Sequence, residues 1–407
     1  MKKLLLITLF VILSLGLVTA ADATSFPFKP ISARTEGMGG AGVATAKGAD
    51  SLFMNPATLA HGKFSLNMPS VSLTVFNVYD ILDSDIPQII ETGGDDMPLN
   101  LAMEFLNKVV TAGRGELLTT DIGVSFTGGG FGLGVNVQEQ LHTTSSDGSL
   151  TNDKIFAEVN VAAPIGLGFR INLVPDVMSL DVGASVKFVY RAYTQKIGAV
   201  QLTSLFDSDD PAQALMENTL VTAGWALPID IGVNLNLPVG FRVSAVARNI
   251  NGNFKMKNYS ELGGWLNEMT ALAGMDPLYQ DDAPETTVGT ENDMVIPWSL
   301  DAGLGWTPYI GNALRPSLAV DLTDVLGVID GSKKLLDNAS AGAELKLLSF
   351  LTARAGINKG YYSVGVGLDL LVAHVDLSYY VREFGAEIGD KRVDALTIRF
   401  NLGVDGQ

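Results

Sequence analysis

The sequence predicts an all-β protein: a transmembrane antiparallel β-barrel of about fourteen strands, with an N-terminal plug (hatch) inside the lumen and helical segments in its outer loops. Segments of roughly ten residues alternate between apolar side chains and polar or small ones, and the apolar face carries no charge. Beyond the N-terminus, no apolar run approaches the ~18 residues of a spanning helix. Long and short connections alternate along the chain, which places long loops on one rim and tight turns on the other.

Composition narrows the function classes. The 407 residues are 47% hydrophobic and 17% charged, with a formal net charge of −17. This acidic balance argues against a nucleic-acid partner, because phosphates are bound by Lys and Arg. The absence of cysteine excludes disulfides, thiolate zinc sites and cysteine nucleophiles. We expect no cofactor, no metal site and no catalytic residue, and hence no enzyme.

The first residues have the pattern of a secretory signal peptide. Lys2 and Lys3 precede an apolar run from Leu4 to Val18, and small residues suited to cleavage follow. We assign 1–23 to this signal, since the run is shorter than the ~20 residues that an uncleaved anchor helix needs. Export of a barrel predicts the outer membrane of a diderm bacterium.

The stretch GMGGAGVATAKGADSLFMNPATLA, from Gly37 to Ala60, raises the possibility of a dinucleotide site because it begins with G-x-G-x-x-G. That fingerprint has to follow a buried strand and open a helix within a βαβ unit. The preceding TSFPFKPISARTE contains two prolines and no hydrophobic strand, so we reject the cofactor interpretation. Residues 24–61 are instead predicted to plug the lumen, with the glycines allowing close packing against the inner wall. The plug glycines are Gly37, Gly39, Gly40 and Gly42.

The plug segment also carries a family resemblance. ARTEGMGGAGVATA followed by ADSLFMNPATLA resembles the hatch of FadL-type long-chain fatty-acid transporters, whose relatives include hydrocarbon-uptake barrels and exported TraF-like conjugal-transfer proteins. Asn55, Pro56 and Ala57 match the Asn-Pro-Ala motif of that hatch. The resemblance implies a fourteen-stranded barrel closed by a hatch. It further implies that outer loops capture hydrophobic substrate, which enters the lumen when the hatch rearranges and leaves sideways through a gap in the wall.

The barrel itself is assigned to 62–407, with long outer loops at about 79–116, 198–221 and 257–293. A soluble β-sandwich or soluble barrel is disfavoured, because its outward faces would carry charge. The strands are predicted to start near Lys63, Leu118, Phe131, Asp153, Met178, Thr222, Phe241, Met294, Arg315, Ala339, Leu351, Tyr361, Leu371 and Val393.

Two outer loops contain apolar residues at helical spacing. These helices either cap the rim by packing together or provide an apolar landing surface for a ligand, and both can hold at once. The candidate capture residues are Leu99, Met103 and Leu106 in the first long loop and Leu262, Trp265, Leu266 and Met269 in the 257–293 loop.

Charges of both signs are predicted to face the lumen. They form paired networks that brace the wall and hold the hatch, or else an arginine such as Arg354 or Arg399 binds a carboxylate headgroup. His374 is read as a member of this network rather than a catalytic base. Acidic outer loops at 207–210 and 281–282 could bind Ca²⁺ weakly, although solvated charge explains them as well. The predicted network comprises Glu344, Lys346, Arg354, Asp369, His374, Asp376 and Arg399.

Two functions remain open from the sequence. The first is a channel for passive uptake of small hydrophobic molecules such as long-chain fatty acids, captured by the outer loops and gated by the hatch. The second is a structural or docking barrel that anchors a secretion, conjugation or surface assembly and transports nothing. The expected partners are the lipid bilayer and a hydrophobic small molecule. A monomer is favoured, although the sequence does not determine the oligomeric state.

Overall fold

The computed structural model describes residues 27–92, 97–104, 108, 114–144, 154–198, 211–272, 274–277, 292–311, 313–348, 350–385 and 388–405. The predicted signal peptide at 1–23, the capture residue Leu106 and the acidic loops at 207–210 and 281–282 lie outside these ranges. No helix in the described part of the chain is both long and apolar enough to cross a membrane.

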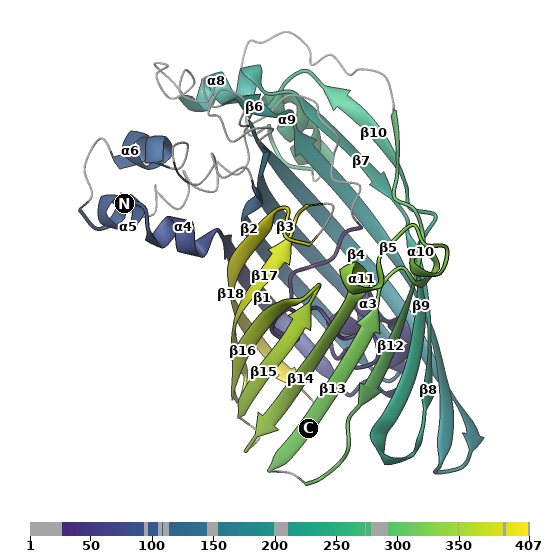
Figure 1. The fold of residues 1–407 in the computed structure, drawn as a ribbon. Helices are drawn as coiled ribbons and strands as arrows, with labels where there is room; N and C mark the ends of the chain where they lie inside the picture. The colour runs from purple at the N-terminus through teal and green to yellow at the C-terminus, as the bar shows by residue number, and fades with distance from the viewer. Residues whose placement is uncertain are drawn as a thin grey trace.

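The protein is a closed antiparallel β-barrel (Figure 1), because the first strand pairs with both the second and the last. The first half of the wall is made of long strands joined by hairpins. Their bounds are β1 (Ser65–Phe76), β2 (Arg114–Gly128), β3 (Phe131–Thr144), β4 (Lys154–Val174), β5 (Met178–Thr194), β6 (Ile197–Gly198), β7 (Val221–Ala226), β8 (Ile229–Asn236), β9 (Phe241–Ile250) and β10 (Asn253–Tyr259).

The second half of the wall returns to the first strand, with β18 running antiparallel to β1 from the pair Ser65–Asp405 to the pair Phe76–Ala395. Its bounds are β11 (Asn292–Val295), β12 (Ser299–Trp306), β13 (Leu314–Leu322), β14 (Ala339–Leu347), β15 (Leu351–Asn358), β16 (Tyr361–Leu370), β17 (Ala373–Glu383) and β18 (Arg392–Asp405).

The eighteen segments of the described chain make fourteen wall strands. The segments β7 and β8 both pair with β5 and together form one interrupted strand. In the same way, β9 and β10 form one interrupted strand, and β11 and β12 form another. The short β6 continues β5 along β4. The predicted fold class is therefore confirmed. The three interruptions were not predicted; two of them contain Pro228 and Pro297, whose missing N–H groups cannot join the ladder.

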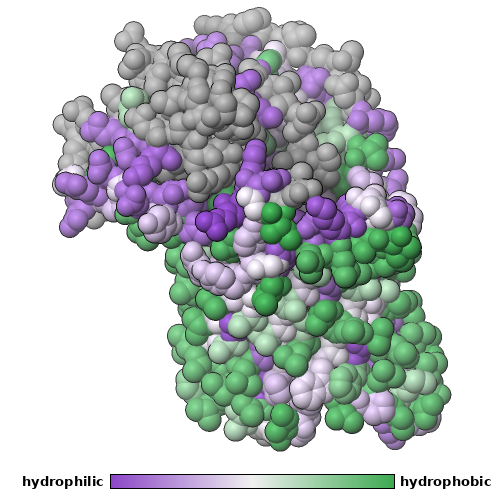
Figure 2. Space-filling view, viewed as in Figure 1, coloured by the Kyte–Doolittle hydropathy of each residue, from purple (hydrophilic) through white to green (hydrophobic). Residues whose placement is uncertain are grey.

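The outer face of the wall is apolar (Figure 2). Large aliphatic and aromatic side chains on it are about 40–65% exposed, among them Leu73, Ile165, Phe169, Leu304 and Ile398. Many inward positions of the same strands are polar or glycine, as the alternation predicts, while others, such as Ala162 of β4 and Val189 of β5, are apolar. A band of exposed apolar side chains around a closed barrel is the surface that lipid covers. We call it the lipid-facing belt.

The two rims differ. One carries tight connections, for example at 129–130 and 371–372, and is called the short-turn rim; the other carries the long loops and is called the long-loop rim. Among the described connections between wall strands, the α-helices stand on the long-loop side (Figure 1), and the short-turn rim carries the 3₁₀ turn η3 (Pro238–Gly240). The α-helices are α4 (Val78–Leu82), α5 (Ile86–Thr92), α6 (Met97–Glu104), α8 (Pro211–Asn218), α9 (Leu262–Leu272), α10 (Val325–Ile329) and α11 (Leu335–Asn338).

Residues 27–62, which we call the plug segment, lie inside the barrel (Figure 1). The segment contains α2 (Ala33–Gly37), α3 (Asp50–Met54) and the 3₁₀ helix η1 (Pro56–His61). The hydroxyl of Ser32 caps α2 by accepting a hydrogen bond from the N–H of Thr35, and Asn55 caps η1 in the same way. These caps keep very short helices folded in a confined space.

Candidate functional site

Glycines on both surfaces let the plug segment touch the wall through its backbone. The Cα of Gly37 lies 3.3 Å from where a Cβ on the wall's Gly365 would be, and a Cβ on Gly39 would lie 2.6 Å from the backbone N of Ile357. Gly39 and Gly40 also have φ of +67° and +81°, which residues with a Cβ rarely adopt. Further wall glycines meet the plug backbone at Gly183, Gly303, Gly342 and Gly356.

The glycine-rich loop does bind an anion, but the anion belongs to the wall. The Asp321 carboxylate on β13 accepts hydrogen bonds from the backbone N of Gly42 at 2.6 Å and of Val43 at 2.8 Å. The Asp321 side chain is almost fully buried. Successive backbone N–H groups form a good site for negative charge. The loop that might have held a pyrophosphate thus holds a side chain of the same molecule.

Asn55 joins two parts of the plug to β8 of the wall. Its side-chain amide donates to the carbonyl of Val43 at 2.9 Å and to Oδ1 of Asn234 at 2.7 Å. Pro56 and Ala57 pack so closely on β5 that Gly183 has no room for a Cβ. All three residues of the motif are buried in the barrel.

Arg248 on β9 holds the end of α3. Its guanidinium donates to the carbonyls of Phe53 at 2.8 Å and Met54 at 2.5 Å, at the C-terminus of the helix where carbonyls lack partners. The same guanidinium pairs with Asp301 on β12 and lies 4.0 Å from Asp230. Asp230 is in turn paired with Lys187 at 2.6 Å.

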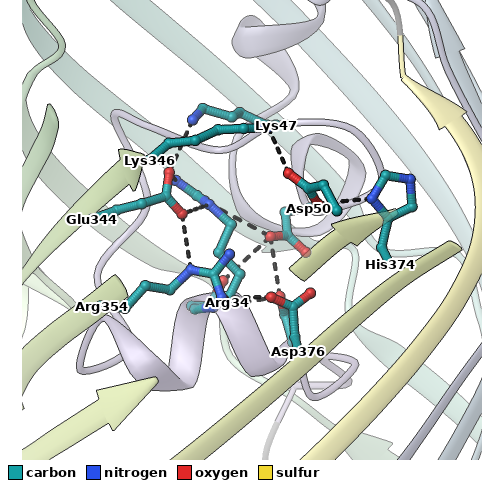
Figure 3. A network of polar contacts seen from close by, with 11 residues as sticks. Arg34, Lys47, Asp50, Glu344, Lys346, Arg354, His374 and Asp376 are labelled. Carbon is teal, nitrogen blue, oxygen red and sulfur yellow. Dashed lines mark hydrogen bonds and ion pairs between the residues drawn. The ribbon is translucent and has the colours of Figure 1, made fainter. Parts of the chain in front are cut away.

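A second network joins α2 to β14, β15 and β17 (Figure 3). Glu344 accepts from Arg34 of the plug at 2.8 Å, from Lys47 of the plug at 3.0 Å and from Arg354 at 3.0 Å. Arg354 also pairs with Asp376 at 2.5 Å. The carboxylate of Glu344 is thus shared between plug and wall.

The predicted lumen residues therefore fall into three groups rather than one. Glu344, Arg354 and Asp376 form the network with the plug. Lys346, Asp369 and His374 form a separate cluster, in which Asp369 lies 2.6 Å from Lys346 and 2.8 Å from His374. Arg399 stands apart and donates to the hydroxyl of Ser70 at 2.9 Å.

A polar cavity of about 570 Å³ lies between the plug and the short-turn rim. Cationic side chains outnumber acidic ones along it, although the whole chain is acidic. His61 reaches its edge, and burial lowers the pKa of this histidine even though Asp181 lies 2.9 Å away. The charged side chains that line the cavity are Arg34, Lys47, Asp50, Lys63, Arg242, Arg315, Glu344, Lys346, Arg354, Asp369, Asp376 and Arg399.

On the long-loop side of the plug, the lumen is apolar along one wall. We call this area the luminal apolar patch. Phe28 and Phe53 of the plug meet there edge to face, with ring centroids 5.8 Å apart, and fill it. Its wall residues are Ala162, Val189, Tyr193, Ala226, Phe254, Met256, Met294 and Ile296. On another part of the wall, Ile31 packs against Phe76 and Tyr380.

The outer-loop helices pack together on the rim. Leu262 and Trp265 of α9 are buried, and the Trp265 indole donates to the Tyr190 hydroxyl at 2.9 Å. Leu266 and Met269 are partly buried against the same core, whereas Met103 of α6 is 41% exposed. Of Leu99 only the helical backbone is described. This core, called the rim cluster, contains Ile86, Leu101, Leu117, Ile155, Phe156, Ala192, Ile197, Leu215, Val221, Ala223, Tyr259, Leu262 and Trp265.

Comparisons with known proteins yield structural likenesses only. No family model and no curated protein sequence matches the chain. The solved structures similar to it include monoaromatic hydrocarbon channels and the translocator domain of the Neisseria meningitidis autotransporter NalP.

The Pseudomonas putida toluene transporter TodX is 13% identical over 94% of this chain and 99% of its own, with a TM-score of 0.47. The Ralstonia pickettii toluene transporter TbuX is 13% identical over 93% and 98%, with a TM-score of 0.47. A Pseudomonas aeruginosa FadL homologue is 10% identical over 93% and 99%, with a TM-score of 0.44. Likeness at these identities and TM-scores indicates neither substrate nor mechanism, and the strand pairing of this chain itself establishes the fold.

Several residues that hold the plug were not singled out from the sequence. The alternation of side chains along β9 places Arg248 on the inner face together with Arg242. The sequence therefore indicates that the Arg248 side chain points into the lumen. The partners of Arg248 could not be predicted, because Phe53 and Met54 come from a segment without periodicity. Arg34 and Lys47 were missed for the same reason. Among the described residues, no group of three or more His, Asp or Glu side chains could hold a metal ion.

Replacing Arg248 by methionine should lower the free energy of unfolding by about 3 kcal/mol, because Asp301 and Asp230 lose a buried partner and α3 loses its C-terminal donor. Urea unfolding of the protein in lipid vesicles, followed by tryptophan fluorescence, measures the change. Lys255→Met provides the control: the pair Lys255–Asp293 is more than half exposed on both sides and should contribute at most about 1 kcal/mol. Equal losses in both variants would contradict the assignment.

Proposed function

We propose that the protein is an outer-membrane channel for passive uptake of small hydrophobic molecules, long-chain fatty acids among them. The long-loop rim would face outward and the short-turn rim the periplasm. The outer loops capture the molecule, and the plug segment, with Gly37, Gly39, Gly40, Gly42, Asn55, Pro56 and Ala57, acts as the gate.

The observation that carries this proposal is the luminal apolar patch. A barrel that only conducts water or anchors other proteins has no need for inward-facing phenylalanine and methionine, since its lumen would be polar. Phe28 and Phe53 cover the patch in the closed barrel. A hydrophobic ligand that binds Phe254 and Met256 therefore competes with the plug for one surface. Its binding energy favours displacement of the plug.

A second observation supports an anionic headgroup on the cargo. Arg399 and Lys29 line a small cavity of about 50 Å³ between the plug and β1–β3. Asp50 and Asp121 also line this cavity, but among the described residues neither carboxylate lies within ion-pair distance of Arg399 or Lys29. Arg354, the other candidate from the sequence, is already paired with Glu344 and Asp376. A free guanidinium can bind a carboxylate with two hydrogen bonds.

Binding and uptake test the proposal. Purified protein should bind a labelled long-chain fatty acid in calorimetry, and cells of a host lacking its own fatty-acid channel should take it up when they express the protein. Phe254→Ser should weaken binding by roughly tenfold or more, because a buried aromatic surface is lost. Phe188→Ser, on the lipid-facing side of β5 and 42% exposed, is the matched control.

The variant Arg399→Gln distinguishes the contribution of the ligand's carboxylate headgroup to binding from that of its apolar tail. It should weaken binding of the fatty acid by about tenfold and leave binding of an uncharged probe, toluene, unchanged. If the wild-type protein neither binds nor takes up either compound, the channel is refuted and the structural barrel, with a permanently fixed plug, remains. Equal effects of Arg399→Gln on both probes would refute the headgroup assignment alone.

A further inference from the structure

An arm of two short helices projects sideways from the long-loop rim. Residues 77–92, with α4 and α5, leave the top of β1 and extend beyond the wall (Figure 1). Three large apolar side chains on this arm are unusually exposed: Tyr79 at 71%, Leu82 at 70% and Ile90 at 60%. Exposed apolar side chains that lie together on one element indicate a protein or membrane interaction site, whereas a single one is ordinary.

Hydrogen bonds to β18 hold the first residues of the arm at the end of the wall nearest the long-loop rim. The backbone N of Asn77 donates to the carbonyl of Asp394 at 2.8 Å, and the backbone N of Tyr79 donates to the Asp394 carboxylate at 3.1 Å. The hydroxyl of Tyr379 lies 3.3 Å from the same carboxylate. Tyr379 sits on β17 at the upper end of the lipid-facing belt, beside the 61% exposed Tyr362. Aromatic residues at this position mark the membrane interface of a barrel.

The arm has one inner and one outer face. Ile86 is buried in the rim cluster, and Ile81 and Ile89 pack against it, so these three side chains attach the arm to the barrel. Tyr79, Leu82 and Ile90 are left on surfaces that the rim cluster does not cover. The apolar belt begins below the base of the arm (Figure 2). Leu73 of β1 and Ile398 of β18 are exposed on the wall strands from which the arm leaves.

We infer that this arm rests on the membrane on the long-loop side and inserts Tyr79, Leu82 and Ile90 into the interfacial region of the adjacent leaflet. The partner is lipid because the exposed side chains continue the lipid-facing belt at the height of its aromatic border. Amphipathic segments with aromatic and aliphatic side chains on one face bind at this depth. The exposed carboxylates of Asp83, Asp85 and Glu91 limit the arm to a shallow position that leaves them in water.

The absence of cysteine makes a direct measurement possible. Single-cysteine variants Tyr79→Cys, Leu82→Cys and Ile90→Cys, each carrying a nitroxide spin label, are reconstituted in vesicles of phosphatidylcholine and phosphatidylglycerol. Electron paramagnetic resonance then compares the accessibility of each label to oxygen, which concentrates in lipid, and to a water-soluble nickel chelate. We expect the oxygen preference at all three positions to approach that of Leu73→Cys in the belt.

Asp83→Cys and Gln88→Cys are the matched controls on the same arm and should favour the nickel chelate, since both side chains are exposed. Heat-modifiable migration in electrophoresis verifies that each variant retains the barrel. The inference is refuted if labels at 79, 82 and 90 match those at 83 and 88. Labels that are immobile and accessible to neither reagent also refute it, because protein would then cover the arm. None of these readouts depends on transport.

Discussion

Replacing Gly356 by alanine should unseat the plug segment and open the barrel to small solutes. Gly356 on β15 faces the lumen, and a Cβ there would overlap the backbone of Met38 and Gly39. Backbone atoms cannot rotate away as a flexible side chain can, and Gly39 is already constrained by its φ of +67°. Overpacking of this kind costs about 1–3 kcal/mol, which shifts the closed plug toward displaced states by roughly 5- to 150-fold.

Single-channel conductance in planar bilayers measures this opening, and sensitivity of expressing cells to a large antibiotic that the outer membrane normally excludes provides a second readout. Ala355→Val is the matched control, because it adds methyl groups on the adjacent outward position, which is exposed to lipid. A Gly356→Ala barrel that conducts no more than the wild type would show that the plug does not depend on this contact.

Replacing Asp321 by alanine should loosen the glycine-rich loop without disturbing the wall strand. The N–H groups of Gly42 and Val43 would lose their acceptor in a buried position. Hydrogen bonds to a charged group contribute about 1.5–3 kcal/mol each, so a combined loss of about 3 kcal/mol corresponds to roughly a hundredfold larger population of detached loop. Hydrogen exchange of residues 37–45, measured by mass spectrometry, should accelerate accordingly.

Asp321→Asn tests the role of charge: both N–H groups donate to the same oxygen, Oδ2, so an amide oxygen in its place can accept both hydrogen bonds without the negative charge and should retain part of the protection. Conductance should follow the same order, with the alanine variant the most open and the wild type the least. Unchanged exchange in the alanine variant would mean that other contacts alone hold the loop.

The strands could be predicted because alternation is a local property. Each wall strand separates lipid from lumen, so successive side chains must suit two different environments, and the sequence records this residue by residue. The predicted starts at Phe131, Met178, Phe241 and Leu351 coincide with the first residues of β3, β5, β9 and β15. The breaks near Pro228, Gly252 and Pro297 could not be predicted, because the alternating apolar pattern continues across them and indicates uninterrupted strands.

The partners of the predicted lumen charges could not be read from the chain. Glu344 and Arg354 are neighbours across two paired strands, a relation that strand order implies. Arg34 and Lys47 reach the same carboxylate from more than 290 residues away in sequence, through a segment with no periodicity. The rim cluster shows the same limit: helical spacing indicated α9, but not that Leu262 and Trp265 would be buried against neighbouring loops and the outside of the wall.

The glycine-rich motif shows which properties follow from the local sequence and which depend on the tertiary structure. Its composition determined that backbone N–H groups would be accessible and that close packing was possible, since both follow from the missing Cβ atoms. Only the tertiary structure decided which anion those N–H groups bind, because Asp321 is 278 residues from Val43 in sequence and reaches it only after the barrel has closed. The sequence therefore determined the wall, whose environment is local. The closed barrel decided what holds the plug in place.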